Sequence, residues 1–480
     1  MILRQFPVER SLVPLSEIPS SWRSERSLRV HLVGCGGAGM RALAEYGIDR
    51  GWRATGSDQA ISQHARRALE ARGMRIADTH AAGNVPADCE LLIYSPAIPE
   101  SNPERVVART MGIREASYPK TLGWISRECA TVAVAGTHGK STVASLIAAV
   151  LRQAGEDPSV LVGAEALSDG RHGRAGAGRW TVIEACEYRR HFLNLSPQTT
   201  VLLGIEPDHF DCFPDVADAE RAYAEFAELT PPDGVVAANA DCARVTQLVR
   251  GRGNVVTYSA GGRDAAFTAS QVQFGSPGVA FEVSHRGRFE SRIESRLLGR
   301  YQASNLLAAY AALRSLGVNA ARIAESFREF PGLRRRLERL TDWRGQARFD
   351  DYGHHPTAVA AVLETLRSSF PRGTLRCVFQ PHQLSRTRAL FGEFASALAL
   401  ADEAFVLPVF AARERSTAEL AACSESLAGA VGGSSRGAFC ASLDHALTTL
   451  ETAGRPGDVL VTIGAGDIDR LHYEIDRRVR

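Results

Sequence analysis

The residues with the clearest chemical potential form a short glycine-containing loop, Gly136-Thr137-His138-Gly139-Lys140-Ser141. Lys140 is one of only two lysines in a chain whose lysines and arginines together number 56. A phosphate-binding loop needs a compact ammonium on a flexible stem, whereas a guanidinium is a bulky planar fork. The backbone N–H groups of such a loop, and of the helix after it, attract phosphate. We therefore predict a nucleotide-phosphate site with Lys140 at the β/γ-phosphates and the Ser141 hydroxyl on Mg²⁺.

A second glycine-rich loop lies earlier in the chain. Gly34, Gly36 and Gly39 match G-x-G-x-x-G, and Asp58 follows about 20 residues later. This fingerprint binds a pyrophosphate at a helix N-terminus and does not itself select nicotinamide. Two interpretations stay open on these residues: an NAD-dependent dehydrogenase fused to an ATPase, or a first domain that binds another diphosphate-containing nucleotide.

Further acids and imidazoles follow expected strands. Glu184-Ala185-Cys186-Glu187-Tyr188 comes after one strand, and Glu206-Pro207-Asp208-His209-Phe210-Asp211 after the next. Such groups beside a phosphate loop suit Mg²⁺ bridging, although strand-end acids also serve as solvated helix caps. Two denser segments lie near the C-terminal end, Asp350-Asp351-Tyr352-Gly353-His354-His355-Pro356 and Gln380-Pro381-His382-Gln383-Leu384-Ser385-Arg386-Thr387. Ligands of α/β folds gather at the strand ends where these segments fall.

The elements that must position these residues are alternating strands and helices. A strand at 28–33 runs into the first loop, and a strand at 131–135 feeds the phosphate loop, which a helix from 142 follows. The pattern predicts an α/β protein of three domains: a Rossmann-like first domain, a central phosphate-loop domain with a parallel sheet, and a Rossmann-like C-terminal domain. The expected boundaries are a leader at 1–26 and domains at 27–127, 128–328 and 329–480.

Three finer expectations concern the middle of the chain. Short alternating segments between about 255 and 297 predict an antiparallel flank on the central sheet. A helix near 303–316 is expected to close that domain. The Gly/Arg/Ala stretch at 170–179 is predicted to be a flexible loop.

Composition narrows the partners and the compartment. The net charge is +2, and the short basic patches carry no interleaved aromatics, so nucleic-acid binding is not expected. Nine scattered cysteines without a CxxC pair favour reduced thiols and a cytoplasmic location. No apolar run approaches the ~18 residues of a membrane span, so membrane insertion is not expected. The sequence leaves a monomer and a homodimer equally open.

In this order the motifs resemble those of the Mur ligases, over nearly the whole chain from about residue 28 to Ile468. The carrying segments are residues 31–40 and 94–98, the phosphate loop 136–141, residues 184–188, and the two C-terminal segments 350–357 and 380–387. The last two are most similar to the alanine-adding branch. The absence of a lysine between His209 and Pro231 also fits that branch.

The resemblance resolves the choice between the two loops. It implies that the first domain holds the UDP of UDP-N-acetylmuramate, the second binds ATP, and the third binds the amino acid, L-alanine. It also implies a two-step reaction with ATP and Mg²⁺. The muramate carboxylate attacks the γ-phosphate to give an acyl phosphate, and the amine of alanine then attacks the activated carbonyl.

The same resemblance implies site residues. The catalytic residues are Lys140, Glu184, His209 and Arg336. The metal ligands are Ser141, Glu184 and His209. The ATP contacts are Gly136, Thr137, His138, Gly139, Lys140, Ser141, Thr142, Asn305, Arg336 and Asp351. The contacts to UDP-sugar or amino acid are Gly36, Gly37, Ala38, Gly39, Ser57, Asp58, Ser95, His355, His382 and Arg386.

The chain also departs from the family pattern. Tyr301 and Gln302 replace residues expected at adenine, and Gly204 stands where asparagine is common. Ala358 replaces a glutamate and is more like the related ligase that attaches recycled murein tripeptide. That ligase, and a non-catalytic Mur-like protein that binds UDP-sugars, are therefore the alternatives within the family.

Overall fold

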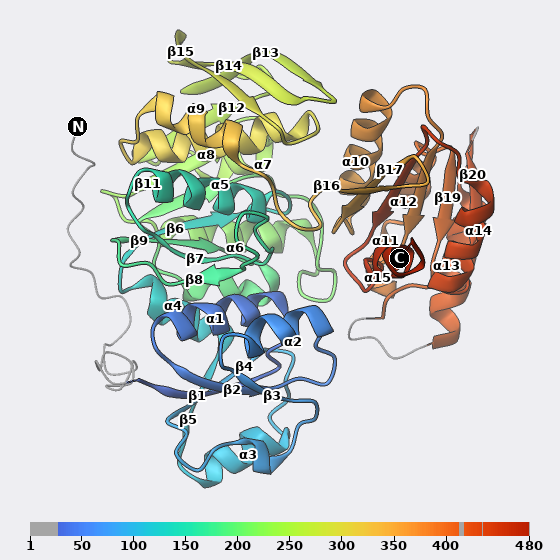
Figure 1. Cartoon of the computed structure of the whole chain (residues 1–480). Helices are drawn as coiled ribbons and strands as arrows, with labels where there is room; N and C mark the ends of the chain where they lie inside the picture. The colour runs from blue at the N-terminus through green and yellow to red at the C-terminus, as the bar shows by residue number, and fades with distance from the viewer. Residues whose placement is uncertain (1–26, 412–416, 434, 480) are drawn as a thin grey trace.

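The computed structural model describes residues 27–411, 417–433 and 435–479, so the predicted leader at 1–26 lies outside the described residues. Three sheets account for the described strands, with five, ten and six strands each. Figure 1 shows the first two stacked along one body and the third beside the central one. The α/β fold class with three domains is confirmed. The first sheet ends at Ser117 and the central sheet begins at Ala130. The central sheet ends at Ser295 and the third sheet begins at Glu338. The predicted divisions at 127/128 and 328/329 fall within those two intervals.

The first sheet is entirely parallel, with the order β3-β2-β1-β4-β5. Its strands are β1 (Arg29–Val33), β2 (Arg53–Ser57), β3 (Arg75–Ala77), β4 (Leu91–Tyr94) and β5 (Arg114–Ser117). Its helices are α1 (Ala38–Asp49), α2 (Gln63–Glu70), α3 (Pro103–Thr110) and α4 (Tyr118–Ser126), with a short 3₁₀ turn η3 (Ala82–Asn84). This order puts the start of α1 at the carboxyl end of the middle strand, where ligands of such sheets bind.

The central sheet has the order β15-β14-β13-β12-β11-β10-β6-β9-β7-β8. Its strands are β6 (Ala130–Ala135), β7 (Ser159–Leu161), β8 (Gly173–Arg174), β9 (Trp180–Glu184), β10 (Thr199–Leu202), β11 (Val235–Asn239), β12 (Val255–Ser259), β13 (Phe267–Gly275), β14 (Gly278–His285) and β15 (Arg288–Ser295). The pairs β13–β14 and β14–β15 are antiparallel, which confirms the expected flank. Because β6 lies between β10 and β9, the phosphate loop is flanked by the segments that follow those strands.

The helices of this domain are α5 (Lys140–Gln153), α6 (Val216–Glu228), α7 (Ala243–Leu248), α8 (Tyr301–Ser315) and α9 (Ala320–Glu329), with a 3₁₀ segment η4 (Tyr188–Asn194). The expected helix near 303–316 is α8. It is buried along most of its length, including Leu306, Tyr310 and Leu313. A helix with so little exposed surface belongs to the core of its domain and not to a solvent-facing layer.

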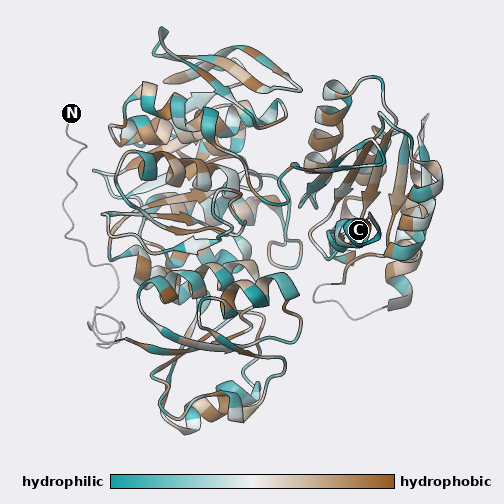
Figure 2. Ribbon diagram, viewed as in Figure 1, coloured by the Kyte–Doolittle hydropathy of each residue, from teal (hydrophilic) through white to brown (hydrophobic). Residues whose placement is uncertain are grey.

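The third sheet has the order β16-β17-β21-β18-β19-β20, with β16 antiparallel to β17 and the other pairs parallel. Its strands are β16 (Glu338–Trp343), β17 (Gln346–Asp351), β18 (Leu375–Phe379), β19 (Glu403–Val406), β20 (Arg436–Phe439) and β21 (Val459–Ile463). Its helices are α10 (Pro356–Ser369), α11 (Leu384–Ala389), α12 (Phe391–Leu398), α13 (Thr417–Ala430), α14 (Leu443–Ala453) and α15 (Arg470–Val479). Figure 2 shows hydrophobic strands inside this domain and a largely hydrophilic α15.

The first two domains share one hydrophobic core. A single buried cluster joins Leu32 and Trp124 of the first domain to Ile183 and Tyr223 of the central one. The buried clusters of the third sheet instead draw on residues from Leu337 to Ile475. The third domain therefore meets the rest of the protein mainly through polar contacts, a kind of interface that permits domain motion.

Most of the stretch at 170–179 is a loop, as predicted, but the prediction that it is flexible was wrong, because the loop is anchored by specific contacts. Residues 173–174 form strand β8, and the Glu45 carboxylate of α1 accepts hydrogen bonds from the backbone N–H of His172 and Gly173, both at 2.8 Å. The glycines are there for close packing: a Cβ on Gly173 would lie 2.0 Å from the carbonyl oxygen of Ala42. Gly173 thus allows backbone contact between two domains, while Gly176 and Gly178 pack against the backbone of residues 156–158 in the central domain.

Candidate functional site

The phosphate loop leads from β6 into α5. Gly136 has φ +147° and Gly139, which caps α5, has φ +81°. An L side chain rarely adopts such a conformation, so glycine is required at both positions. The Lys140 ammonium donates to the carbonyl oxygens of Gly136 at 2.6 Å and Thr137 at 3.3 Å. The backbone of the loop therefore folds around its lysine.

Glu187 is the carboxylate that faces this lysine. Lys140 Nζ lies 3.0 Å from it, and His209 Nε2 lies 3.3 Å away on its other side. The side chains of Lys140 and Glu187 are only 14% and 5% exposed. Burial acts to lower the pKa of Lys140, but Glu187 raises it, so the lysine stays charged. Burial acts in turn to raise the pKa of Glu187, which Lys140 and His209 lower.

The three predicted metal ligands lie around the same loop with separate contacts. Ser141 Oγ accepts a hydrogen bond from Arg336 at 3.0 Å. Glu184 Oε2 accepts one from the backbone N–H of Gly163 at 2.7 Å. Within the described residues, no hydrogen bond or ion pair joins Glu184 to His209, whose imidazole contacts Glu187 instead. Ser141 and Glu184 offer the oxygen donors that Mg²⁺ prefers.

The remaining predicted ATP contacts converge from two domains. Thr142 is buried in the first turn of α5. Asn305 lies against the phosphate loop, because a Cβ on Gly139 would be 2.4 Å from Asn305 Oδ1. Asp351 accepts hydrogen bonds from the backbone N–H of Leu337 at 2.7 Å and Gly353 at 2.6 Å. Burial raises the pKa of Asp351 to about 6, against the lowering effect of Arg336.

The residues that depart from the family pattern also have partners. Gln302 Oε1 accepts from the Asn305 amide at 2.9 Å, and Gln302 is 3% exposed. Tyr301 packs under Gly299, where a Cβ would lie 2.6 Å from its ring. Gln302 therefore orients Asn305 towards the loop.

A second carboxylate, Glu206, links the phosphate loop to the third domain. His138 Nε2 lies 3.3 Å from Glu206 Oε2, His355 Nδ1 lies 3.6 Å from it, and the Thr357 hydroxyl donates to it at 2.7 Å. We call His138, Glu206 and His355 the Glu206 cluster. The hydrogen bond from His138 lowers the pKa of Glu206 to about 2, with burial acting in the opposite direction.

Arg386 contacts the central domain at Asp208 and also contacts His382 of its own domain. The Arg386 Nε donates to Asp208 Oδ1 at 2.8 Å and its Nη1 donates to the His382 carbonyl at 3.1 Å. Arg386 is 3% exposed, so this ion pair is buried. Arg386 thus pairs with the residue that directly precedes His209.

Four residues in the segments that carry the site side chains have a backbone with positive φ. The φ values are +55° for His209, +58° for Arg335, +48° for Leu337 and +69° for Gln383. Each such conformation costs about 1–3 kcal/mol, and it persists where the surrounding contacts fix it. Strain of this kind clusters at functional sites.

A large cavity lies where the three domains meet. Its volume is about 1130 Å³. From the first domain it is lined by Gly36, Gly37, Ala38, Arg41, Asp58 and His64 among others. From the other side it is lined by Tyr352 of the third domain and by Arg334, Arg335 and Arg336 of the segment 330–337, which joins α9 to β16 and which we call the hinge. Its size suits a nucleotide-sized ligand, and its arginines suit an anionic one.

Of four further predicted contacts in the first domain, only Asp58 lines the cavity. Asp58 Oδ2 accepts from the Gly36 N–H at 2.8 Å, so it folds over the glycine loop. Ser57 is fully buried and donates to Glu104 at 2.6 Å, under the sheet. Gly39 packs on Tyr118, whose ring would meet a Cβ at 2.8 Å. Gly39, Ser57 and Ser95 are not among the residues that line the cavity.

Glu165 ties the three domains together at this cavity. It is 4% exposed and pairs with His64 at 2.9 Å, Arg334 at 2.9 Å and Arg41 at 3.4 Å. Burial acts to raise its pKa, but these partners lower it to about 2. No motif in the sequence identified Glu165. Glu187 lay inside a recognised segment without an assigned role, and Glu206 lay beside His209 in another.

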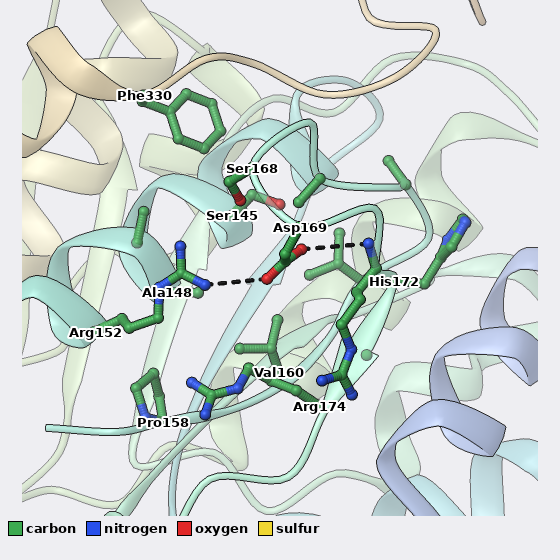
Figure 3. Close-up of a pocket in the computed structure, with 16 residues that line it drawn as sticks. Ser145, Ala148, Arg152, Pro158, Val160, Ser168, Asp169, His172, Arg174 and Phe330 are labelled. Carbon is green, nitrogen blue, oxygen red and sulfur yellow. Dashed lines mark hydrogen bonds and ion pairs between the residues drawn. The ribbon is translucent and has the colours of Figure 1, made fainter. Parts of the chain in front are cut away.

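A smaller cavity of about 50 Å³ lies on the other side of His172 (Figure 3). It is lined mainly by apolar side chains such as Val160 and Phe330, with the ion pair between Arg152 and Asp169 at 3.0 Å. His172 borders both cavities, and burial lowers its pKa to about 3. The small volume cannot hold a nucleotide.

Sequence models of three domains match this chain: the Mur ligase family catalytic domain over residues 29–129, the Mur ligase middle domain over 134–313, and the Mur ligase glutamate ligase domain over 335–466. A curated UDP-N-acetylmuramate–L-alanine ligase from Caldanaerobacter subterraneus is 34% identical over 95% of this chain and 97% of its own length. This chain belongs to the Mur ligase family.

Two solved structures share the fold. The UDP-N-acetylmuramate–alanine ligase of Thermotoga maritima superposes with a TM-score of 0.81 at 25% identity, over 94% of this chain and 99% of that one. A murein peptide ligase from Psychrobacter arcticus gives a TM-score of 0.75 at 22% identity, over 94% and 98%. The second likeness concerns the fold alone. None of the helices in the described ranges is long and apolar enough to cross a membrane.

Proposed function

We propose that this Mur ligase joins L-alanine to the carboxylate of UDP-N-acetylmuramate, with ATP as the source of energy, in the synthesis of a peptidoglycan precursor. The observation that carries the proposal is the convergence of three segments on one loop. Lys140 lies inside the loop, Arg336 of the hinge reaches Ser141, and Asp208 pairs with Arg386 of the third domain. The names of the curated relatives support the choice of substrates.

The first step of the reaction brings two anionic groups together, the carboxylate of the muramate and the triphosphate of ATP. A carboxylate oxygen of the muramate attacks the γ-phosphorus of ATP, the bond to ADP breaks, and an acyl phosphate forms. Lys140, the N-terminus of α5 and Arg336 place positive charge where phosphate oxygens would lie. Glu187 neutralises Lys140, so the lysine carries no unpaired buried charge.

In the second step the amine of alanine attacks the acyl carbon. The amine loses a proton, the C–N bond forms, and the C–O bond breaks to release phosphate. His382 and Arg386 lie across the domain interface from His209, and we assign them to the amino-acid side. The polar interface of the third domain would allow it to open for the amino acid and to close for reaction.

We also propose that Ser141 and Glu184 hold Mg²⁺, with His209 as a further ligand once it leaves Glu187. Bound Mg²⁺ would neutralise charge on the triphosphate and the reacting carboxylate. The donor set fits in part: the hydroxyl and the carboxylate are hard oxygen donors, whereas an imidazole suits Mg²⁺ less well.

We also propose that the protein works in a reducing cytoplasm, because all nine cysteines are free thiols in the structure.

Phosphate release from ATP tests the function directly. The purified protein would be given UDP-N-acetylmuramate with L-alanine, glycine, L-serine or the murein tripeptide, each in a separate reaction. Release that requires both the nucleotide sugar and L-alanine supports the proposal. Release with the tripeptide alone would move it to the recycling ligase, which Ala358 leaves open. UDP-sugar binding without release for any acceptor would indicate a non-catalytic relative.

A further inference from the structure

The Glu206 cluster brings one carboxylate and two imidazoles from three segments to one point. His138 comes from the phosphate loop, Glu206 follows β10, and His355 begins α10 of the third domain. One ligand atom from each lies within 4.8 Å of the other two. The cluster is distinct from the Ser141, Glu184 and His209 set assigned above to Mg²⁺.

The hydrogen bonds of His355 place its Nδ1 lone pair near the Glu206 carboxylate, where it accepts only a long hydrogen bond of 3.3 Å from the N–H of Thr357. Its Nε2 lies 3.2 Å from the carbonyl oxygen of Pro207, which can only accept, so Nε2 carries the proton. Nδ1 is then an acceptor, and it lies 3.6 Å from Glu206 Oε2, which is also an acceptor. Two acceptors at this distance repel each other unless a cation lies between them. An imidazole whose other nitrogen donates to a backbone carbonyl is also the usual arrangement of a metal-bound histidine.

The distances fit the edges of a tetrahedral site. Nitrogen and oxygen ligands about 2.0–2.1 Å from a zinc ion are about 3.3–3.4 Å from each other. The observed distances to Glu206 Oε2 are 3.3 Å from His138 and 3.6 Å from His355. The third edge is at most 4.8 Å and would have to contract. The Thr357 N–H donates a long hydrogen bond of 3.3 Å to His355 Nδ1, and metal binding would have to break it.

The cluster is also accessible. The side chains of His138 and Glu206 are each 35% exposed, so an ion can enter and water can complete its coordination. Two imidazoles and one carboxylate suit Zn²⁺ and its neighbours among the transition metals, whereas Mg²⁺ prefers oxygen donors alone.

We propose that His138, Glu206 and His355 bind one transition-metal ion, with Zn²⁺ the best fit, and that the bound ion fastens the phosphate loop to the third domain. The ion would bind at His138 Nε2, and the ring proton that now faces Glu206 would move to Nδ1 of the same imidazole. Since the loop and α10 must separate when the domains open, the ion would hold the domains closed. The site does not depend on the proposed substrates.

Cobalt absorption tests the site without any nucleotide. Co²⁺ would be titrated into the full-length protein in excess Mg²⁺, which occupies oxygen-donor sites. We expect a visible band that saturates at one equivalent and is displaced by Zn²⁺. His355→Asn keeps a residue that can cap α10 and removes the imidazole. Glu206→Gln keeps a partner for Thr357 and removes the charge. Both should weaken Co²⁺ binding by at least about tenfold.

His445→Gln is the matched control, because His445 is exposed on α14, away from the cluster. It should leave the band unchanged. Circular dichroism of every variant separates loss of the site from loss of the fold. The proposal is overturned if the wild type gives no band, if the band survives in both cluster variants, or if its spectrum indicates thiolate ligands.

Discussion

The two glycine-rich loops of this protein begin with the same architecture and solve their electrostatics differently. In the central domain, Lys140 lies inside the loop and Glu187 of the same domain neutralises it. In the first domain, the loop has no lysine, and the nearby Arg41 and His64 side chains contact Glu165 of the central domain. Each loop thus faces one buried carboxylate.

The difference lies in what each carboxylate joins. Glu187 connects residues of a single domain, so its role is local to the phosphate site. Glu165 also forms an ion pair with Arg334 of the hinge, and so connects three domains at the shared cavity. We infer that the first pair governs chemistry, whereas the second governs domain arrangement and the binding of the nucleotide sugar. Four substitutions test this comparison, ordered from the largest expected effect to the smallest.

Lys140→Met should have the largest effect. It removes the charge that faces the phosphates, so we expect kcat for phosphate release to fall by about 10³-fold or more. Binding of the UDP-sugar, measured by calorimetry, should remain, since the first loop lies elsewhere. The other lysine of the chain, Lys120, is exposed on α4 and offers the matched control: Lys120→Met should keep full activity. Retained turnover in Lys140→Met would remove the phosphate loop from the reaction.

Glu165→Gln should act on stability. The folded-state pKa of Glu165 is lowered to about 2 from an ordinary value of 4.5. A lowered acid pKa stabilises the fold above the unfolded pKa, and this stability is lost as the pH falls from about 4.5 to 2. The variant should therefore lose about 3 kcal/mol of unfolding free energy at neutral pH and show a flatter dependence in that window. Denaturant unfolding at pH 7, 4 and 3 measures both. If the variant shows the same dependence of unfolding free energy on pH as the wild type, Arg41, His64 and Arg334 do not stabilise the charged form of this carboxylate.

Glu187→Gln keeps the shape of the side chain and removes its charge. Lys140 and His209 would lose a shared anion, so their positions should loosen. We expect kcat to fall by about tenfold, with little change in the KM for the nucleotide sugar. Steady-state kinetics with each substrate varied in turn gives this split. A rise in the KM for the nucleotide sugar instead would blur the distinction between the two carboxylates.

His64→Gln should have the smallest effect, because the His64 side chain is 45% exposed and water screens its pair with Glu165. We expect less than about 1 kcal/mol of destabilisation. Combined with Glu165→Gln in a double-mutant cycle, it measures the coupling directly. A coupling larger than that of Arg41 with Glu165, measured in the same way, would make His64 the principal contact between the first two domains.

Much of the fold was predictable because its patterns are local. The strand–loop–helix around Lys140 and the alternating segments of β13 to β15 each follow from residues close in the chain. The stretch at 170–179 failed for the opposite reason. Its glycines suggested freedom, but Gly173 is pressed against the backbone of α1, a contact that only the packing of two domains creates.

The candidate site divides in the same way. The sequence predicts roles for Lys140, Ser141, Glu184 and His209 because their motifs carry their chemistry within a few residues. It placed Ser57 at the ligand, whereas the structure buries this side chain under the sheet on Glu104. A strand alternates its side chains between two faces, and the register that decides between them is a property of the whole sheet.

The sequence by itself determined the α/β class, the two glycine loops, the order of motifs and, through them, the family. These depend on backbone geometry and on short-range spacing, which a linear chain records. Only the tertiary structure decided that Glu187 pairs with Lys140, that Glu165 joins three domains, and that Glu206 meets two histidines. Each of these carboxylates is defined by partners from distant segments, and Coulomb interactions depend on distance in space and burial, not on separation along the chain.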